Sequence, residues 1–256
     1  MKTLSTMIIV VLACGPASPA LADWQVGDEA KMERPQLPDP NGWDIDMTEY
    51  TLADDWRCSE TGVVTDIHFW YSVKGDKDEI STPHIRQIRV SIHDNIPVGP
   101  GNFSIPGPLL WEHTFDETEF RIAGPWGGIQ GWDRPEPDTN CEPDDHTRYW
   151  QVNIEDIAPD PNHGLFRQEI GNIYWLDLSV VPAASGTDPL EIGWKTTEEI
   201  NYDSAVYLDA NGIWQMIAVC TDDHETDLAF VIVPEPITMG LLAAGALAML
   251  RRRRKS

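Results

Sequence analysis

The chain has few basic residues and few cysteines, and each shortage excludes a class of function. Against 42 Asp and Glu there are only 18 Lys and Arg, which gives a formal net charge of −24. A body this acidic repels nucleic acid and anionic lipid, so we expect no nucleic-acid partner. The four cysteines include no Cys-x-x-Cys pair and no zinc-type spacing, which argues against the common zinc and dithiol redox sites.

Enzyme signatures are also missing from the sequence. There is no Gly-x-Ser-x-Gly elbow, no His-Glu-x-x-His motif, no phosphate-binding Gly loop and no dinucleotide fingerprint. His224-Glu225 begins a zincin-like pair, but Leu228 stands where the second His is needed. We therefore expect a non-enzymatic protein with no catalytic residue. A secreted polysaccharide hydrolase and a purely structural or protein-binding module are the alternatives, since a glycosidase needs two carboxylates across a cleft and the sequence nominates no pair.

No stretch inside the body keeps a helical period, whereas short β-type runs recur between turn signals rich in Gly, Pro, Asn and Asp. There are ten such runs, Val63 to Val73, Ile85 to His93, Leu109 to Phe115, Phe120 to Ala123, Tyr149 to Ile154, Asn172 to Val181, Glu191 to Thr196, Ala205 to Leu208, Ile213 to Val219 and Leu228 to Val233. Their period-two alternation predicts an all-β fold, an antiparallel β-sandwich of jelly-roll type.

The N-terminus has the pattern of a secretory signal peptide. Lys2 precedes an apolar run, and the small-residue site Ala20-Leu21-Ala22 precedes Asp23. This pattern predicts cleavage by signal peptidase after Ala22. The competing interpretation is a lipoprotein site at Cys14, but Leu12 fits the lipobox pattern poorly.

The last residues of the chain have the pattern of an export address. Pro234-Glu235-Pro236 is followed by fourteen apolar or small residues, Ile237 to Leu250, and then by Arg251, Arg252, Arg253, Arg254 and Lys255. A helix of that length spans roughly 21 Å, short of the ~30 Å hydrocarbon core, so it inserts only marginally. The cations after it stay on the cytoplasmic side and leave the body on the outer face. A simple C-terminal membrane anchor is the alternative.

The tail, with its three parts in this order, resembles the PEP-CTERM sorting signal of bacterial surface and exopolysaccharide-associated proteins. The resemblance implies recognition by a membrane-embedded exosortase, removal of the tail, and export to the cell surface or beyond. It also implies that the C-terminal helix inserts into the membrane, either until the tail is removed or as a retained anchor. Without Lys2 and the five cations of the tail, 12 basic residues oppose 42 acidic ones, a net charge of −30.

The body is similar to a domain of unknown function that recurs in secreted bacterial proteins with the same tail. The resemblance covers most of residues 31 to 233 and brings no known activity. The segments that carry it are Ala53-Asp54-Asp55-Trp56-Arg57-Cys58, Thr65-Asp66-Ile67-His68-Phe69-Trp70, Tyr149-Trp150-Gln151-Val152-Asn153-Ile154, Ile173-Tyr174-Trp175-Leu176-Asp177, Gly193-Trp194-Lys195-Thr196 and Asp227-Leu228-Ala229-Phe230-Val231-Ile232. The chain thus divides into a signal peptide (1–22), an extended lead-in (23–47), one β-sandwich domain (48–233) and a sorting tail (234–256).

Three cysteines, Cys58, Cys141 and Cys220, remain after signal cleavage. Because their number is odd and the compartment is oxidising, at most one intramolecular disulfide can form.

A long Gly- and Pro-rich segment between Gly124 and His146 is predicted to be an irregular loop, and it holds a candidate calcium site. Asp138, Asn140, Glu142 and Asp144 alternate as oxygen ligands do, although the glycine and the final Glu of an EF-hand are missing. The alternative is a solvated acidic loop. Calcium is the only cofactor that the sequence suggests.

Tryptophan is abundant, with 11 in the chain. Trp150, Trp194 and Trp214 lie in apolar runs and are expected in the core. The alternation places Trp70 and Trp175 on polar faces, where exposed indoles could stack on sugars.

If the strands that begin at Val63, Ile85 and Asn172 are neighbours, one solvent-facing sheet carries a candidate exopolysaccharide-binding face. Its members are Asp66, His68, Trp70, Arg89, Trp175 and Asp177. Burial of these indoles under a loop is the alternative. On the same assumption Asp66, His68, Ser91 and His93 could converge, although chance co-occurrence on a polar face explains them as well.

Overall fold

The structure is a computed structural model. It describes residues 23–77, 84–97, 103–135, 141–159, 164–185, 188–220 and 225–234. The predicted signal peptide (1–22) and the residues of the sorting tail beyond Pro234 lie outside these ranges. No helix in the described ranges is long and apolar enough to cross a membrane.

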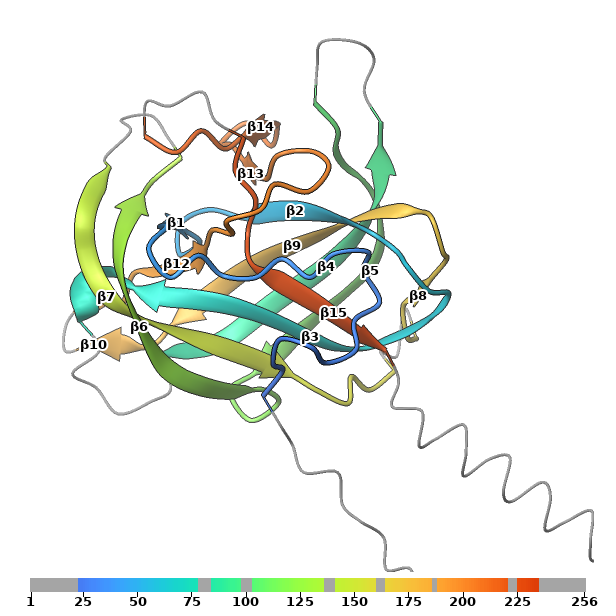
Figure 1. Ribbon diagram of the computed structural model, residues 1–256, viewed down its shortest axis with the longest axis horizontal. Coiled ribbons are helices and arrows are strands. Elements are labelled where there is room, and N and C mark those ends of the chain that lie inside the picture. The colour runs from blue at the N-terminus through green and yellow to red at the C-terminus, as the bar shows by residue number, and fades with distance from the viewer. Residues whose placement is uncertain are drawn as a thin grey trace, which may run out of the picture.

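The body is built from strands in two layers (Figure 1). The elements are β1 (Trp43–Asp46), β2 (Leu52–Arg57), β3 (Gly62–Val73), the 3-10 turn η1 (Lys74–Asp76), β4 (Ile85–Ile96), β5 (Ile105–Asp116), β6 (Arg121–Asp133), β7 (Glu142–Ile154), β8 (Arg167–Gln168), β9 (Ile173–Pro182), β10 (Ala184–Ser185), β11 (Asp188–Pro189), β12 (Ile192–Lys195), β13 (Val206–Leu208), β14 (Trp214–Met216) and β15 (Phe230–Pro234). Sheet I has the order β12-β1-β6-β7-β3-β15, with β8 paired to β3, and sheet II has the order β14-β13-β2-β9-β4-β5.

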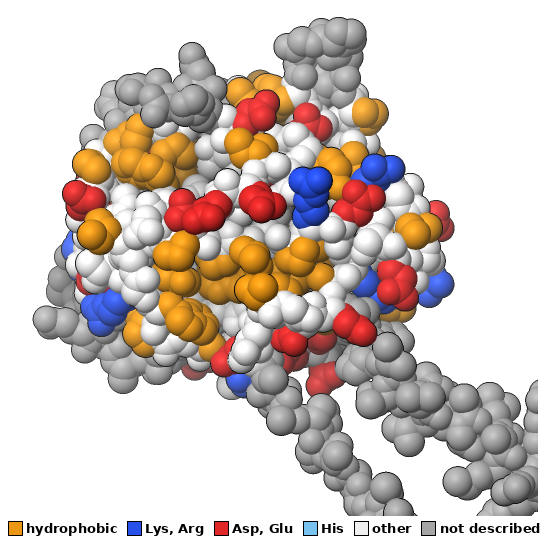
Figure 2. All heavy atoms as spheres, in the orientation of Figure 1, with side chains coloured by type: hydrophobic (Ala, Val, Ile, Leu, Met, Phe, Trp, Pro, Cys, Tyr) orange, Lys and Arg blue, Asp and Glu red, His pale blue; other side chains and the backbone are white. Residues whose placement is uncertain are grey.

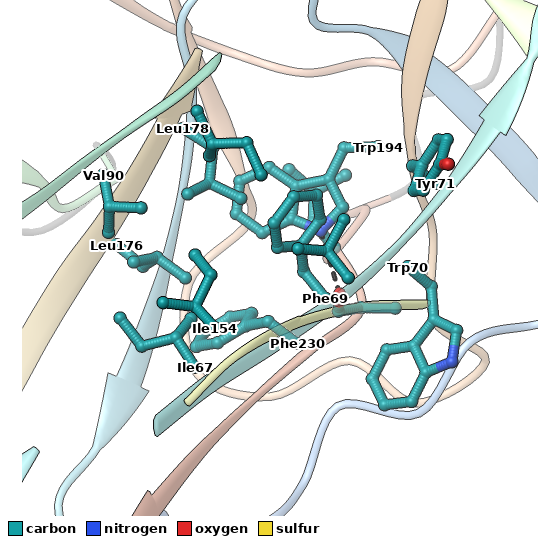
Figure 3. Close-up of a cluster of buried hydrophobic side chains, with 14 of the residues drawn as sticks. Ile67, Phe69, Trp70, Tyr71, Val90, Ile154, Leu176, Leu178, Trp194 and Phe230 are labelled. Atoms are coloured by element: carbon teal, nitrogen blue, oxygen red, sulfur yellow. Dashed lines mark hydrogen bonds between the residues drawn. The ribbon is translucent and has the colours of Figure 1, made fainter. Parts of the chain in front are cut away.

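The hydrophobic core lies between the two sheets, where period-two alternation puts it. In β3, Ile67, Phe69 and Tyr71 are fully buried, and they lie in one cluster with Leu176 and Leu178 of β9 (Figure 3). The predicted β-sandwich is confirmed. Among the described strand pairs only β1 and β6 run parallel. The finer jelly-roll description stays a prediction.

All ten predicted runs overlap observed strands, but the sequence missed β1, β2 and the two-residue strands β8, β10 and β11. It also mistook most of residues 124–146 for an irregular loop. The structure instead continues β6 and β7 through this region as a long hairpin with register shifts between Ala123 and Trp126 and again near Gln130. The glycines and prolines mark these irregularities in the ladder, because bulges use the same residues as turns. Trp126 is 40% exposed, whereas Trp132 is fully buried.

Five strands of sheet I close into a ring, because β12 pairs with both β1 and β3. The circuit runs β12-β1-β6-β7-β3 and back to β12. Trp194 of β12 packs into the sandwich core, while its neighbour Lys195 points to the opposite face and into the ring. The residue before Trp194 must be a glycine, Gly193, since a Cβ there would lie 2.7 Å from the Trp132 ring.

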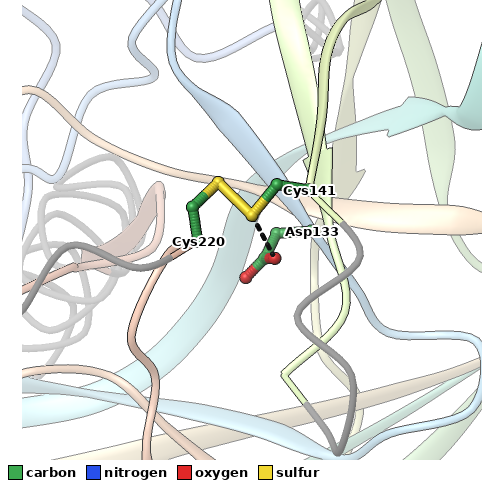
Figure 4. Close-up of a disulfide and its surroundings, with 3 residues drawn as sticks. All are labelled: Asp133, Cys141 and Cys220. Carbon is green, nitrogen blue, oxygen red and sulfur yellow. Dashed lines mark hydrogen bonds between the residues drawn. A yellow bond between two sulfur atoms is a disulfide. The ribbon is translucent and has the colours of Figure 1, made fainter.

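One disulfide joins Cys141 to Cys220 (Figure 4), within the limit of one that the odd number of cysteines sets. It ties the start of β7 to the segment that leads into β15. Cys58 is buried and free.

Trp150 and Trp194 lie in the core as predicted, whereas Trp214 is only half-buried. Trp194 has no exposed surface, and its Nε1 donates to the Ala229 carbonyl at 2.9 Å.

We predict that Trp194→Ala lowers the free energy of unfolding by roughly 3 to 5 kcal/mol, as large-to-small core changes do. Trp126→Ala is the matched control, because its side chain is 40% exposed, and it should cost less than about 1 kcal/mol. Urea denaturation of both variants measures the difference. Equal losses would contradict the assignment of Trp194 to the core.

Candidate functional site

The predicted glycan-binding face does not exist as a surface, and this prediction is wrong. Trp70 is 6% exposed and Trp175 is fully buried. They also lie on different sheets, because β3 belongs to sheet I and β9 to sheet II. An indole without an open face cannot stack on a sugar.

The lead-in explains why Trp70 is covered. Trp24 is buried edge-on against Trp70, with ring centroids 6.1 Å apart, and its carbonyl accepts a hydrogen bond from Gln151. Further along, Lys31 and Gln36 donate backbone hydrogen bonds to β15. The lead-in is therefore part of the folded body.

The polar members of the predicted face have partners of their own. His68 is buried and its Nδ1 lies 2.7 Å from the Asn153 side-chain oxygen, and burial lowers the pKa of His68 to about 4. Burial raises the pKa of Asp66 to about 6, although Asp66 accepts from the Asp156 amide. Arg89 forms an exposed ion pair with Glu112 at 2.8 Å.

Ser91, His93 and Asp177 do come together on sheet II, but not as a catalytic triad. Ser91 faces Asp177 in the β4–β9 register, and His93 Nε2 lies 2.6 Å from Asp177 Oδ2. His93 Nδ1 is 2.9 Å from the Gly107 carbonyl. Both ring nitrogens are engaged, so neither remains to accept a proton from Ser91. Asp66 and His68 lie on the other sheet and do not join them.

The predicted calcium loop is described only in part. Asp138 and Asn140 lie outside the described residues. Glu142 is already paired with Lys74, at 2.7 Å from its Nζ. Asp144 is exposed in β7 with a φ of 56°. The site at these four residues stays a prediction.

The ring in sheet I encloses charged side chains with no exposed surface. Asp44 Oδ2 lies 3.0 Å from His146 Nε2 and 3.3 Å from Lys195 Nζ. Lys195 also donates to Gln130, which accepts a further bond from Ser72. Burial alone would raise the pKa of Asp44, but the charges of Lys195 and His146 outweigh it and hold the pKa below its usual range.

His146 is held between two carboxylates, since its Nδ1 lies 3.0 Å from Asp145. Burial would lower the pKa of His146, but hydrogen bonds and charges from Asp44 and then Asp145 raise it. The cluster is enclosed, so its role is to hold β1, β6, β7 and β12 together. Removing one charged member of such a buried cluster leaves the charge of its partner uncompensated.

A second cluster, of Asp54, Asp55, Asp203 and Asp227, lies where β13 stops pairing with β2. We call it the acidic cluster. Asp54, Asp55 and Asp227 are at most 1% exposed. Burial, followed by repulsion from Asp203 and Asp227, raises the pKa of Asp55 to about 9. Burial also raises the pKa of Asp227 to about 7. The pKa of Asp54 lies well above its usual range, first because Asp54 is buried and then because Asp227 repels its charge.

An open pocket of about 250 Å³ lies beside Trp43 at one end of the body. Its polar lining consists of Asp39, Thr196, Thr197, Glu198, Glu225 and Thr226. Trp43 is half-buried, and its ring packs on Gly131, where a Cβ would come within 2.4 Å of the ring. Thr196 fixes the Trp43 backbone, since its Oγ1 accepts from the Trp43 amide and donates to the Trp43 carbonyl.

The Trp43 pocket lies at the end of the body opposite Pro234. Thr196 of the pocket bridges to Leu228, just before β15, whereas Pro234 at the far end of β15 pairs with Val64 of β3. Six extended residues separate these points by roughly 20 Å. Figure 1 shows β15 running away from the β1–β12 region toward the lower edge of the body.

On the face seen in Figure 2, apolar side chains gather in a central group with many acidic and few basic side chains around it. This distribution agrees with the strongly acidic composition.

The sequence analysis missed both the acidic cluster and the Trp43 pocket. One signal was available for the cluster: Asp54 and Asp55 interrupt an otherwise apolar run from Leu52 to Trp56. Two adjacent carboxylates in a strand point to opposite faces, so at least one must be buried in a sandwich. For the pocket no comparable signal exists, because its residues come from three distant segments.

We predict a pH-dependent contribution from His146. The folded-state pKa lies above the unfolded value, so the stabilisation is complete below about pH 6.5 and is lost as pH rises through the folded pKa. In His146→Gln this loss disappears, and stability changes less between pH 6 and pH 9 than in the wild type. Urea denaturation at both pH values measures it.

His113→Gln is the control, because His113 is a partly exposed histidine on β5. It should keep the wild-type pH dependence. A His146→Gln variant with an unchanged dependence would show that Asp44 and Asp145 do not hold the proton on His146.

Comparison with known families agrees with both parts of the chain. A model described as a PEP-CTERM protein-sorting motif matches residues 233–255, which implies an exported protein that an exosortase processes. Neither the curated proteins nor the solved structures contain a match. A model described as a domain of unknown function, DUF7901, matches residues 32–233. The chain therefore belongs to the DUF7901 family and carries a PEP-CTERM sorting motif at its C-terminal end.

Proposed function

We propose that this protein is a non-enzymatic surface or extracellular-matrix protein whose body binds glycan in the Trp43 pocket. The part of the proposal that concerns export rests on the sorting motif at residues 233–255. Signal peptidase removes residues 1–22, the C-terminal segment holds the precursor in the inner membrane, and an exosortase then cuts near Pro234-Glu235-Pro236.

The observation that carries the proposal is the composition of the pocket. An indole is set among hydroxyls and carboxylates, and sugars are held by stacking on an aromatic ring while polar groups take their hydroxyls. At about 250 Å³ the pocket is slightly smaller than the ~300 to 1,000 Å³ of ordinary ligand sites. It therefore suits one unit of a polysaccharide.

The charge of the pocket selects among sugars. Asp39, Glu198 and Glu225 line it, and none of the described basic side chains does. Uronic acids and sulfated sugars would be repelled, whereas neutral and amino sugars would be accepted. Its position opposite Pro234 supports outward display before the tail is cut.

A secreted hydrolase is the second candidate, and the same three carboxylates favour it. Glycoside hydrolysis uses two carboxyl groups on either side of the scissile bond. Product formation from a bound glycan would distinguish an enzyme from a binding protein. Absence of both binding and turnover would leave a structural module.

We predict that the exported protein retains neutral or amino-sugar glycans on an array, without turnover. Trp43→Phe should weaken retention about five-fold while it keeps the ring that packs on Gly131, since losing part of the stacking costs about 1 kcal/mol. Glu198→Gln should change the preference between neutral and amino sugars.

Trp126→Ala is the control, because Trp126 is exposed on β6 but does not line the pocket. Its retention should equal that of the wild type. If Trp43→Phe and Trp126→Ala behave alike, the Trp43 pocket is not the glycan site.

A further inference from the structure

The acidic cluster lies on an edge of β2 that β13 leaves uncovered. β13 pairs with β2 only at Leu52 and Ala53, so Asp54 and Asp55 lie beyond its end. The segment before β15 fills this place, where the Leu228 amide donates to Asp54 Oδ2 at 2.6 Å. Residues 201–204 arrive from the other side, and the Asn201 amide donates to Asp227.

Several oxygens in this place are buried without a hydrogen-bond partner among the described residues. They are Oδ1 of Asp227, Oδ1 of Asn201, Oγ of Ser204 and both carboxylate oxygens of Asp55, whose charged form is stabilised by the Asp203 backbone without a well-formed hydrogen bond. These four residues are at most 4% exposed. Two of them are neutral, so the missing partners are not explained by protonation of the carboxyl groups. Buried polar atoms in native proteins are nearly always paired, with protein, water or an ion.

Among the residues that the structure describes, no basic side chain balances the cluster. None of the ion pairs formed by described residues includes Asp54, Asp55, Asp203 or Asp227. The contrast with the ring is direct, because there Lys195 and His146 neutralise Asp44. A buried charge is normally paired or coordinates a metal.

We propose that the acidic cluster binds a calcium ion. The oxygens of Asp55, Asp203 and Asp227 supply the charge, and those of Asn201 and Ser204 complete the protein ligands. Calcium accepts six to eight oxygen ligands in a flexible geometry, whereas zinc prefers nitrogen and sulfur and magnesium demands a near-ideal octahedron. A set of carboxylate, amide and hydroxyl oxygens from separate segments fits calcium best.

The ligands must move together to share one ion. Among the described residues, the one group of three acidic, His or Cys side chains with ligand atoms mutually within 4.8 Å is Asp133, Cys141 and Cys220. Two of its members form the disulfide, so it offers no thiolates. In the acidic cluster, the short Asp side chains would have to rotate before their oxygens come within the ~2.3 to 2.6 Å of one ion that calcium requires. The ion would then join β2 to the segments before β13 and β15.

Thermal unfolding of the exported protein with CaCl2 or with a chelator tests the proposal. At a hundredfold excess over Kd, calcium should raise the Tm by roughly 5 to 10 °C, and magnesium should raise it less. Asp55→Asn and Asp227→Asn should each weaken calcium binding at least tenfold by calorimetry. In chelator Asp55→Asn should unfold close to the wild-type temperature, since Asn has the shape of Asp and brings no charge into the buried site.

Glu117→Gln is the matched control, because it removes one acidic charge at an exposed position in the turn between β5 and β6. It should keep the full calcium response. Terbium is a second probe, since Trp175 lies opposite Asp55 in the β2–β9 register and should sensitise its emission. The proposal is overturned if calcium leaves the Tm unchanged, if Asp55→Asn responds like the wild type, or if Glu117→Gln loses as much of the response as Asp55→Asn. Glycan retention is measured separately, so failure at either site is distinguishable.

Discussion

The structure depends on one short strand, β12, which pairs with two strands at once. Its pairing with β1 and β3 closes the ring, and its alternation sends Trp194 into the sandwich core and Lys195 into the ring. Lys195 is the cation that makes burial of Asp44 tolerable. Residues immediately after β12 fix Trp43 and line its pocket. The core, the ring and the candidate binding site thus meet at β12 and the residues directly after it.

Local alternation was enough to predict the two-sheet fold, because a half-buried strand has a period of two regardless of its partners. The same alternation correctly placed Ile67, Phe69 and Tyr71 on one face and Trp70 on the other. It could not show that Trp24, far away in the chain, covers Trp70. The prediction of the candidate site failed for this reason. The face of the strand on which a side chain lies is set locally, whereas its exposure depends on segments from distant parts of the chain that pack over it. Glycines in β6 similarly marked bulges rather than a loop.

The polar chemistry gathers at one end of the body. The Trp43 pocket and the acidic cluster meet around residues 225–228, where Glu225 lines the pocket and repels Asp227. The Cys141–Cys220 disulfide holds the adjoining segment to β7. Pro234 lies at the other end of β15. A body processed through its tail would therefore present this end away from the membrane.

The central claim is that the cell exports one folded body, which lies between the predicted signal peptide (1–22) and the sorting tail (234–256). Asp23 supports the first boundary, since its carboxylate contacts Arg121 and Asn153, and β15 ends at Pro234 against β3. Intact-mass analysis of the protein released by a host with an exosortase tests this most directly. The account predicts a mass that begins at Asp23 and ends within Pro234 to Pro236. A surface protein that keeps Arg251 to Arg254, or a lipid on Cys14, would contradict it.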